Sequence, residues 1–223
     1  MPIPPSALIG SPRRLVSAIV LFVALDLSVL LINLWLAEQM AQDAVAINLA
    51  GRQRMLSQQT TKALLLATNA PTANGSDAAN LELEAAFGLL LQTQKAFAQG
   101  GETRGGDGKT VTLQAVHGEA ARVVARAQEI IAPLEQLLSA PVPVGGSQAP
   151  RLSQAADYMV NHNQDLLSLM NTLTTALEHD SVRRARNLRA IQTGAFVLAL
   201  GNFLAIVIGM LSQFRRIEHD SQQ

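Results

Sequence analysis

The sequence has no cysteine and only one tryptophan, one tyrosine and six phenylalanines among its 223 residues. The lack of cysteine excludes disulfide scaffolds, cysteine metal sites and cysteine nucleophiles. Charge is also scarce, and the 17 basic and 17 acidic side chains cancel. The chain therefore lacks the basic surface of a nucleic-acid-binding protein and the acidic excess of a disordered tail. Hydrophobic residues make up 48 % of it, and they must be buried in a core or in lipid.

Two long apolar runs favour lipid. Leu15 to Ala37 is 23 residues long with one charge, Asp26, and Ile191 to Leu211 is 21 residues long with none. Each is long enough to cross a hydrocarbon core of about 30 Å as a helix. The first is too long for the apolar region of a cleavable signal peptide, which has about 7 to 15 residues. We therefore predict transmembrane helices over residues 15–37 and 191–212.

Arginines near these runs predict the orientation. The tails 1–14 and 213–223 each carry an arginine pair close to the membrane, which places both termini in the cytoplasm: Arg13 with Arg14, and Arg215 with Arg216. Residues 38–190 are then periplasmic, in a protein of a bacterial inner membrane. Four arginines just before the second run oppose this orientation, but a domain of about 150 residues is translocated largely regardless of its charge. We expect these four to contact lipid headgroups: Arg183, Arg184, Arg186 and Arg189.

The region between the runs is predicted to be helical. Three stretches rich in turn-forming residues divide it, over 70–76, 99–109 and 140–150. Between them, apolar residues recur at three- and four-residue spacing, as Leu113, Val116 and Ala120 do. This spacing predicts four helices, over about 38–69, 78–98, 111–139 and 151–190, of which the first and last continue into the apolar runs. The predicted fold is all-α, an antiparallel four-helix bundle flanked by two transmembrane helices.

The first of these helices has two apolar faces. At 100° per residue, Met55 and Leu65 lie within about 40° of Gly51, and Arg54 lies about 60° to one side. A second face is centred roughly 140° away and carries Val45, Leu49, Leu56 and Ala63. One face can pack inside the bundle. The other requires a further partner, most simply the same helix of a second chain, which Gly51 would allow to approach closely.

Arg54 has two interpretations on this pattern alone. Two such arginines facing each other across a symmetric interface repel unless an anion lies between them, and a guanidinium binds planar oxyanions through its fork of donors. Alternatively, Arg54 extends to water and pairs with a carboxylate on a neighbouring helix.

A longer run around these residues carries a resemblance. Residues 43–58 read DAVAINLAGRQRMLSQ. This run resembles the signature of the type IV pili methyl-accepting chemotaxis transducer N-terminal (PilJ-type) domain, and it is similar to the ligand box of the nitrate and nitrite sensor kinases NarX and NarQ. The resemblance implies a dimeric periplasmic four-helix sensor that binds a small anion, such as nitrate or nitrite, between the first helices of two subunits.

The resemblance also assigns site residues. Arg54 matches the anion-binding arginine of the family, Gly51 matches its glycine, and Arg52 matches a position that is often basic in the pilus-type version. The match weakens after Gln58, where residues 59–62 read QTTK and the pilus-type pattern usually has Arg-Met-Ala-Lys. The missing second basic residue bears on the identity of the ligand more than on the fold.

Other motifs give no catalytic or metal site. Residues 105–110 end like a phosphate-binding P-loop, but Thr103 stands where that pattern needs glycine and no apolar strand precedes it. We therefore predict a flexible loop there. The four histidines have no metal-ligand spacing, and no nucleophile with a base and an orienting partner is discernible. We expect no enzyme, no metal and no cofactor.

Inside the apolar runs, Asp26 is expected to turn toward a partner, because a carboxylate in lipid is costly. Asn202 lies at a similar depth when both residues are counted from the cytoplasmic ends of their runs. We predict a hydrogen bond between these two side chains across the spans; the alternative is a protonated Asp26 that is merely tolerated in the bilayer.

Two functions follow from this reading. The segment 213–223 is too short for a kinase or a methyl-accepting coiled coil, so the first is a homodimeric sensor that signals through a separate cytoplasmic or membrane partner. The second is a non-catalytic membrane scaffold that keeps the sensor fold without binding a ligand. Replacement of Arg54 by alanine should abolish ligand binding under the first and have little effect under the second.

Overall fold

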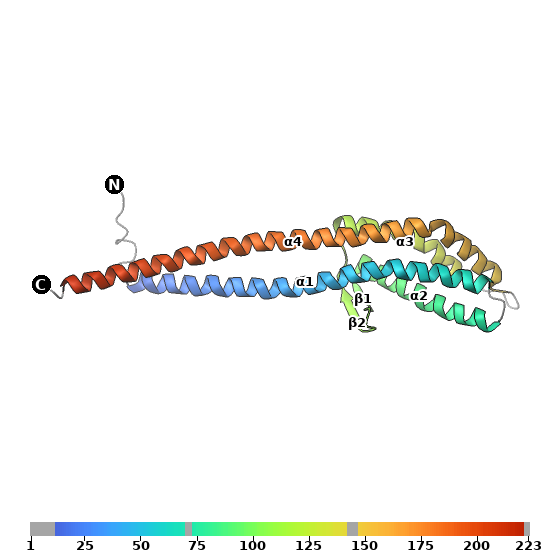
Figure 1. Cartoon of the computed structure of the whole chain (residues 1–223), viewed down its shortest axis with the longest axis horizontal. Coiled ribbons are helices and arrows are strands. Elements are labelled where there is room, and N and C mark those ends of the chain that lie inside the picture. Colours follow the sequence, from blue (N-terminus) through green and yellow to red (C-terminus); the bar gives the residue numbers. More distant parts are fainter. Residues whose placement is uncertain (1–11, 70–72, 142–146, 221–223) are drawn as a thin grey trace. The chain divides into compact units, whose positions relative to one another are not determined.

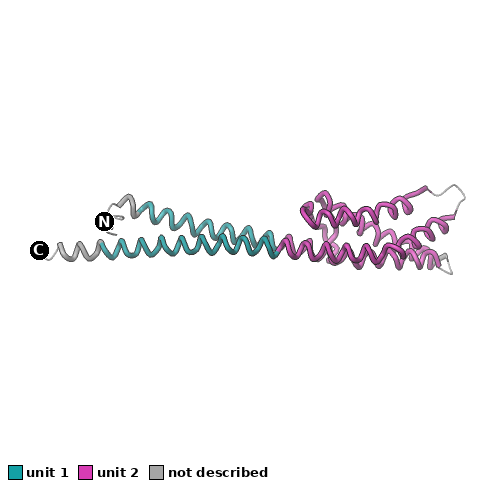
Figure 2. The backbone as a smooth tube through the Cα atoms, turned by 90° about the horizontal axis from the view of Figure 1, so that it is seen from above, with its two compact units in different colours: residues 1–40, 182–223 teal, residues 41–181 magenta. Residues whose placement is uncertain are grey.

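The structure is a computed structural model that describes residues 12–69, 73–141 and 147–220. It is mostly helical, with α1 and α4 each continuous over their whole length (Figure 1). The elements in chain order are α1 (Pro12–Asn69), α2 (Ala73–Gln99), β1 (Gly101–Arg104), β2 (Thr110–Leu113), α3 (Gly118–Ser139) and α4 (Ala149–Asp220). The chain forms two compact units, one of residues 1–40 with 182–223 and one of residues 41–181 (Figure 2).

In the first unit, the beginning of α1 and the end of α4 lie side by side (Figure 2). Asn202 Nδ2 of α4 donates to the carbonyl oxygen of Ala18 in α1 at 2.9 Å. Further along, the amide of Gln192 donates to the side chain of Asn33. From the first contact to the second, the residue number rises on α1, from 18 to 33, and falls on α4, from 202 to 192. The two helices are therefore antiparallel.

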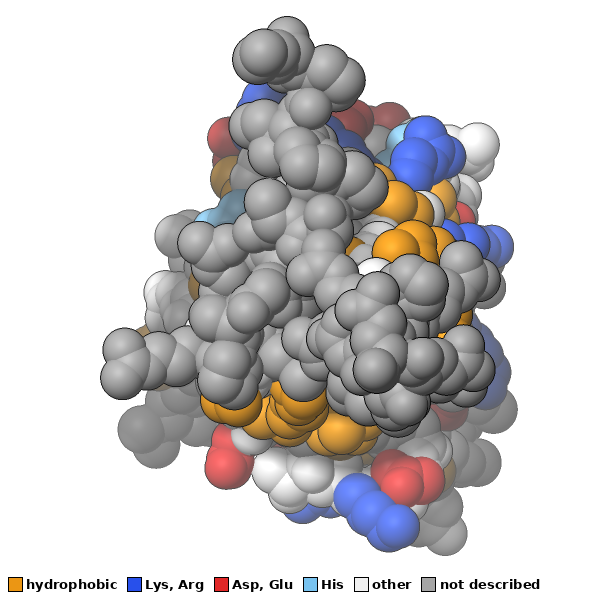
Figure 3. All heavy atoms as spheres, turned by 90° about the vertical axis from the view of Figure 1, so that its left-hand side faces the viewer, with side chains coloured by type: hydrophobic (Ala, Val, Ile, Leu, Met, Phe, Trp, Pro, Cys, Tyr) orange, Lys and Arg blue, Asp and Glu red, His pale blue; other side chains and the backbone are white. Residues whose placement is uncertain are grey.

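The large apolar side chains of this unit are mostly exposed. Both α1 and α4 contain an apolar window long enough to cross a membrane, of which 0 % and 17 % is buried, respectively. The end view in Figure 3 shows hydrophobic side chains at the surface, and Leu34, Leu198 and Val20 are each more than 60 % exposed. A core helix of a soluble protein would be mostly buried. These helices are therefore candidate membrane spans, since an apolar surface of this size needs lipid or another chain to cover it.

The predicted hydrogen bond between Asp26 and Asn202 is wrong. Asn202 is bonded instead to Ala18, which lies roughly two turns, or about 12 Å, away from Asp26 along α1. Asp26 itself is exposed. Counting depth from the ends of the apolar runs assumed that both runs end at one level, whereas the contact between Ala18 and Asn202 fixes a different register.

The second unit has a core to which all four helices contribute. One cluster of buried residues includes Leu64 of α1, Leu90 of α2, Leu134 of α3 and Met159 of α4. The other includes Leu49, Phe97, Val124 and Leu173 of the same four helices, together with Leu113 of β2. The predicted stripes are therefore buried, which explains why these segments are helical: one face of each segment is apolar and covered by the others.

The predicted helix over 111–139 is wrong at its beginning. Thr110–Leu113 forms β2, which pairs antiparallel with β1 so that Gly101 faces Leu113 and Arg104 faces Thr110. The helix α3 begins only at Gly118, whose φ of 62° favours glycine. Leu113 and Val116 belong to the same hydrophobic cluster as α3, so their spacing reflected burial rather than a helix. The turn-rich stretch predicted over 99–109 accordingly contains β1 and most of a hairpin turn.

Other boundaries also differ. The helix predicted to begin near residue 78 begins at Ala73. The residues directly after Ala73, which were predicted to form a turn, are its first turn. Parts of several predicted segments lie outside the described residues: 1–11 of the N-terminal tail, 70–72 and 142–146 of two predicted turns, and 221–223 of the C-terminal tail.

Candidate functional site

An exposed stripe runs along α1 in the second unit. Its members alternate at four- and three-residue spacing and are Ala44, Asn48, Gly51, Met55, Gln58, Lys62 and Leu65, all exposed except Gly51, which is partly exposed. The side chains of Met55 and Leu65 are 47 % and 40 % exposed. The opposite side of this segment, with Leu49, Leu56 and Leu64, is buried in the core. The α1 stripe thus has the spacing of a coiled-coil seam on a helix whose other face is already covered.

Gly51 lies in the middle of the α1 stripe. A Cβ atom at this position would meet no other atom within 4 Å, so nothing in the described part of the same chain requires a glycine. Glycine in a helix interior is less favourable than alanine by about 1 kcal/mol. A glycine at an exposed position of a helix permits the close approach of another backbone or of a ligand.

Arg54 lies beside the α1 stripe and is exposed. Its carbonyl oxygen accepts a hydrogen bond from Ser57 Oγ at 3.3 Å. The guanidinium makes no ion pair or hydrogen bond over residues 12–69, 73–141 and 147–220. The carboxylate partner that one interpretation of the sequence required is thus not found in this part of the chain, and all donors of Arg54 are available to a ligand.

Arg52 points elsewhere, because it is two residues from Arg54 and therefore about 160° away around the helix. Its Nη1 donates to two carbonyl oxygens of the hairpin, those of Arg104 at 3.2 Å and Gly105 at 2.6 Å. The structure thus brings together Gly51 and Arg54 but not Arg52. The role of Arg52 here is to hold the β1–β2 hairpin against α1.

The hairpin turn that Arg52 holds is tightly built. Gly105 N donates to Lys109 O at 2.7 Å, and Lys109 N donates to Asp107 Oδ1 at 3.1 Å. A Cβ atom on Gly105 would lie only 2.9 Å from Asp107 Oδ1, so a larger residue there would have to displace the Asp107 side chain. Gly108, with φ of 80°, closes the turn. The residues that ended like a P-loop thus join two strands, whereas a P-loop joins a strand to a helix.

A layer of buried polar side chains separates the two hydrophobic clusters. Gln53 lies between their members on α1, Thr93 and Gln94 do so on α2, and each is no more than 1 % exposed. The hydroxyls of Thr93 and Thr103 of β1 are 2.7 Å apart, and Gln94 Nε2 donates to Val124 O at 2.9 Å. Both polar atoms of Gln53, and Oε1 of Gln94, have no hydrogen-bond partner in the described part of the chain. A buried amide of this kind costs about 1–3 kcal/mol unless water bridges it.

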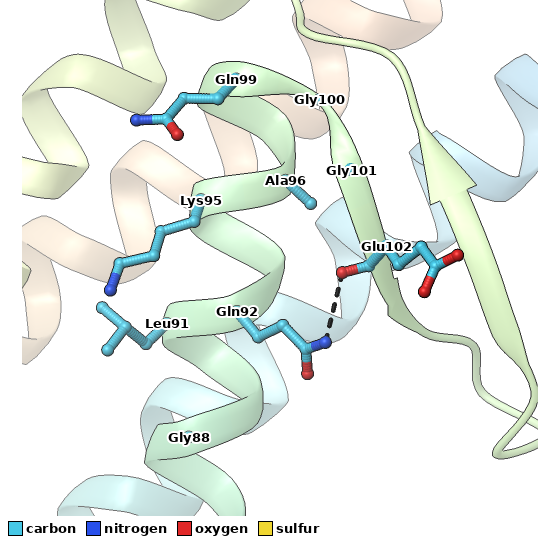
Figure 4. Close-up of a pocket in the computed structure, with 9 residues that line it drawn as sticks. All are labelled: Gly88, Leu91, Gln92, Lys95, Ala96, Gln99, Gly100, Gly101 and Glu102. Atoms are coloured by element: carbon cyan, nitrogen blue, oxygen red, sulfur yellow. Dashed lines mark hydrogen bonds between the residues drawn. The ribbon is translucent and has the colours of Figure 1, made fainter.

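A surface pocket of about 320 Å³ opens beside α2 and β1 (Figure 4). Gln92 Nε2 donates to Glu102 O at 3.2 Å at its edge, and Lys95 pairs with Glu135 of α3, Nζ to Oε1, at 3.2 Å. Lys95, the cation among the described residues that line this pocket, is therefore already paired. No group of three or more His, Asp or Glu side chains that could hold a metal is found among the described residues.

Sequence reasoning missed the hairpin and the polar layer. The hairpin has a signal, since Thr110 to Leu113 alternate polar and apolar residues after Asp107 and Gly108, a dipeptide that favours turns. Gln53 has no such signal, because its burial depends on helices that are distant in sequence.

These features define a class. The described residues form a helical unit that presents an unpaired cation and a glycine on an exposed stripe, and the same helix α1 contains a candidate membrane span. The class that the fold defines is thus a helical domain continuous with candidate membrane spans, with an exposed cation available to a ligand or to a partner.

A comparison with protein families assigns the chain to a family. Residues 35–156, more than half of its length, match the family PilJ, described as type IV pili methyl-accepting chemotaxis transducer N-terminal. The chain belongs to this family, which is a sensory, non-catalytic domain type. No curated protein and no solved structure matches the chain. The matched range includes Gly51, Arg52 and Arg54, and the similarity to NarX and NarQ stays a prediction.

Proposed function

We propose that this protein is a membrane-anchored sensor that binds a small anion, nitrate or nitrite, between the α1 helices of two copies. Residues 38–190 would form an antiparallel four-helix bundle in the periplasm, between spans over 15–37 and 191–212. The observation that carries the proposal is the guanidinium of Arg54, which has no partner in the described residues and lies beside Gly51 on the exposed α1 stripe.

The α1 stripe supports pairing with a second copy. Its alternating spacing of four and three is what two parallel helices need to interlock side chains along a seam. Met55 and Leu65 supply apolar surface, and Gly51 leaves room for the second backbone. In a two-fold pair every residue of the stripe faces the same region of its copy.

Such pairing brings two Arg54 side chains toward one another. Two unit charges about 4 Å apart repel by roughly 4 kcal/mol near a protein surface. An anion between them converts this repulsion into two charge-assisted interactions, and a flat oxyanion fits the planar donor fork of each guanidinium. The pairing of the helices and the binding of the anion would then be thermodynamically coupled, which is the property that a sensor requires.

The experiment is thermal unfolding of the full chain in lipid nanodiscs with nitrate, nitrite, sulfate or chloride, because a ligand that binds only the folded state raises the midpoint. We expect nitrate or nitrite to raise it selectively, and Arg54→Ala to remove the rise. Arg126→Ala, at an exposed arginine of α3, is the matched control. A wild-type chain that pairs but shows no selective rise would instead favour the scaffold that has lost ligand binding.

Pairing itself is measured by cross-linking. The chain has no cysteine, so a single one can be introduced without background. We expect Met55→Cys on the α1 stripe to form disulfide-linked dimers. Val160→Cys on α4, at a similarly exposed position, should form few. Equal cross-linking of both variants would contradict pairing along α1.

A further inference from the structure

A second pocket lies in the unit of residues 41–181, between α2, the end of α3 and the beginning of α4. Its volume is about 410 Å³, within the range of small-molecule sites. Its apolar wall includes Leu83, Phe87 and Leu91 of α2, Leu138 of α3 and Leu152 of α4. Three charged side chains also line it: Glu84, Glu135 and Arg151. It shares no residue with the α1 stripe.

Arg151 lines this pocket, and one edge of its guanidinium is unused. Its Nη1 donates to the carbonyl oxygen of Ala140, which fixes one corner of the guanidinium. Its Nε is shielded from solvent and has no hydrogen-bond partner among residues that the structure describes. The edge that contains Nε is one that a carboxylate binds with two parallel hydrogen bonds. A shielded donor of a charged group without an acceptor is unfavourable, so a ligand carboxylate would stabilise it.

Glu84 supplies the opposite charge. It is exposed and makes no ion pair or hydrogen bond within the described ranges. The other carboxylate of the pocket, Glu135, is already paired with Lys95 at 3.2 Å. The pocket therefore offers one available cation, one available anion and an apolar wall that includes the ring of Phe87.

We infer that this pocket binds a small zwitterion with an apolar side chain, of the kind that a hydrophobic α-amino acid represents. Its carboxylate would bind the Nε edge of Arg151, its ammonium would pair with Glu84, and its side chain would pack against Phe87 and the leucines. Neither charge of such a ligand would be left unpaired in the pocket. This site requires neither Arg54 nor pairing of two chains, so it stands independently of the anion site.

Three probes separate the contributions of the two charges. Phenylalanine carries both charges, phenylpropionate only the carboxylate, and phenethylamine only the ammonium. We would measure their binding to the full chain in nanodiscs by titration calorimetry. Phenylalanine should bind saturably, and each of the other two should bind at least about tenfold more weakly, because each lacks one charge-assisted interaction.

Substitutions then assign each charge to its residue. Glu84→Gln should weaken phenylalanine binding at least about tenfold but leave phenylpropionate binding undiminished, since only the ammonium partner is lost. Arg151→Lys keeps the charge but removes the Nε edge, and it should weaken both carboxylate probes. Glu82→Gln alters a carboxylate outside the pocket that pairs with Lys62 and should change nothing, as should Arg54→Ala.

The proposal has clear contrary results. It is wrong if phenylalanine shows no saturable binding up to about 10 mM, which would mean an affinity too weak for a built site. It is also wrong if the three probes bind equally, or if Glu84→Gln and Glu82→Gln have the same effect. Because Glu84 is exposed and has no partner among the residues described, its substitution tests the site even if Arg151→Lys fails to fold.

Discussion

Replacement of Gly51 by alanine should act in opposite directions on the folding of one chain and on the pairing of two. In a single chain the new Cβ atom meets nothing within 4 Å, so it creates no clash. The helix gains the difference in propensity between the two residues, about 0.8–1.0 kcal/mol. For a chain of this length, the melting midpoint should rise by roughly 2–4 °C in the absence of nitrate.

The same substitution should weaken the pairing of two chains. If the α1 stripes of two copies meet at Gly51, each added methyl group enters a close backbone contact. Overpacking of that kind costs about 1–3 kcal/mol, and 1.4 kcal/mol corresponds to a tenfold change in an equilibrium constant. We therefore expect weaker dimerisation by about tenfold or more, and a smaller rise of the melting midpoint with nitrate.

A matched control separates the two effects. Gly88 lies inside α2, and a Cβ atom there also meets nothing within 4 Å. Gly88→Ala should therefore give the same gain in stability while leaving cross-linking through Met55→Cys and the nitrate response unchanged. Full cross-linking and an intact nitrate response in Gly51→Ala would refute the assignment of Gly51 to an interface. A lower melting midpoint of the unpaired Gly51→Ala chain would contradict the open space around Gly51.

Three further predictions concern the second unit. Gln53→Met should raise the free energy of unfolding by about 1–3 kcal/mol, because it removes an amide whose two polar atoms have no partner in the described residues; a loss of stability in chemical denaturation would show that water satisfies this amide. Arg52→Ala should speed hydrogen exchange of the amides in 101–113, because the hairpin loses its bonds to α1, whereas unchanged exchange would mean that Thr93 and Gln92 alone hold it. Burial raises the pKa of Tyr158 above its ordinary value of 10.0, so this phenol stabilises the fold below pH 10.0 and loses that contribution as the pH rises toward its folded pKa. Tyr158→Phe should lose this alkaline step in a pH series of melting curves and should be less stable by about 1 kcal/mol at neutral pH, since the bond from its hydroxyl to Ile130 O is absent; an alkaline step of the same size in both proteins would contradict this.

The helices could be predicted because their burial is periodic within each segment. Met159, Leu166, Met170 and Leu173 follow the helical spacing and are all fully buried, so pattern and packing agree. The hairpin escaped because its strands have four residues each, too few for alternation to stand out. Leu113 therefore fitted the helical stripe of α3 although it belongs to a strand. It is apolar because it is buried in the same cluster as residues of α3, and spacing alone does not distinguish the two cases.

The site could be predicted only in part, for a different reason. Gly51 and Arg54 are neighbours on one helix, so their common face follows from 100° per residue. The zwitterion pocket joins Glu84 of α2 to Arg151 of α4, which no local pattern connects. The partner of Asn202 likewise depends on the register between α1 and α4, which the lengths of the apolar runs do not determine.

Three successive residues of α1 connect the exposed cation to the interior. Arg54 points outward, Gln53 lies in the polar layer of the core, and Arg52 holds the hairpin. Because each step around a helix is 100°, a rotation or shift of α1 moves all three side chains together. Apolar layers on either side interlock tightly and resist such a shift, whereas Gln53 has no hydrogen bond to lose in the described residues. An anion that draws Arg54 toward a second chain would therefore displace α1 most easily at this layer, and the hairpin bonds of Arg52 would report it.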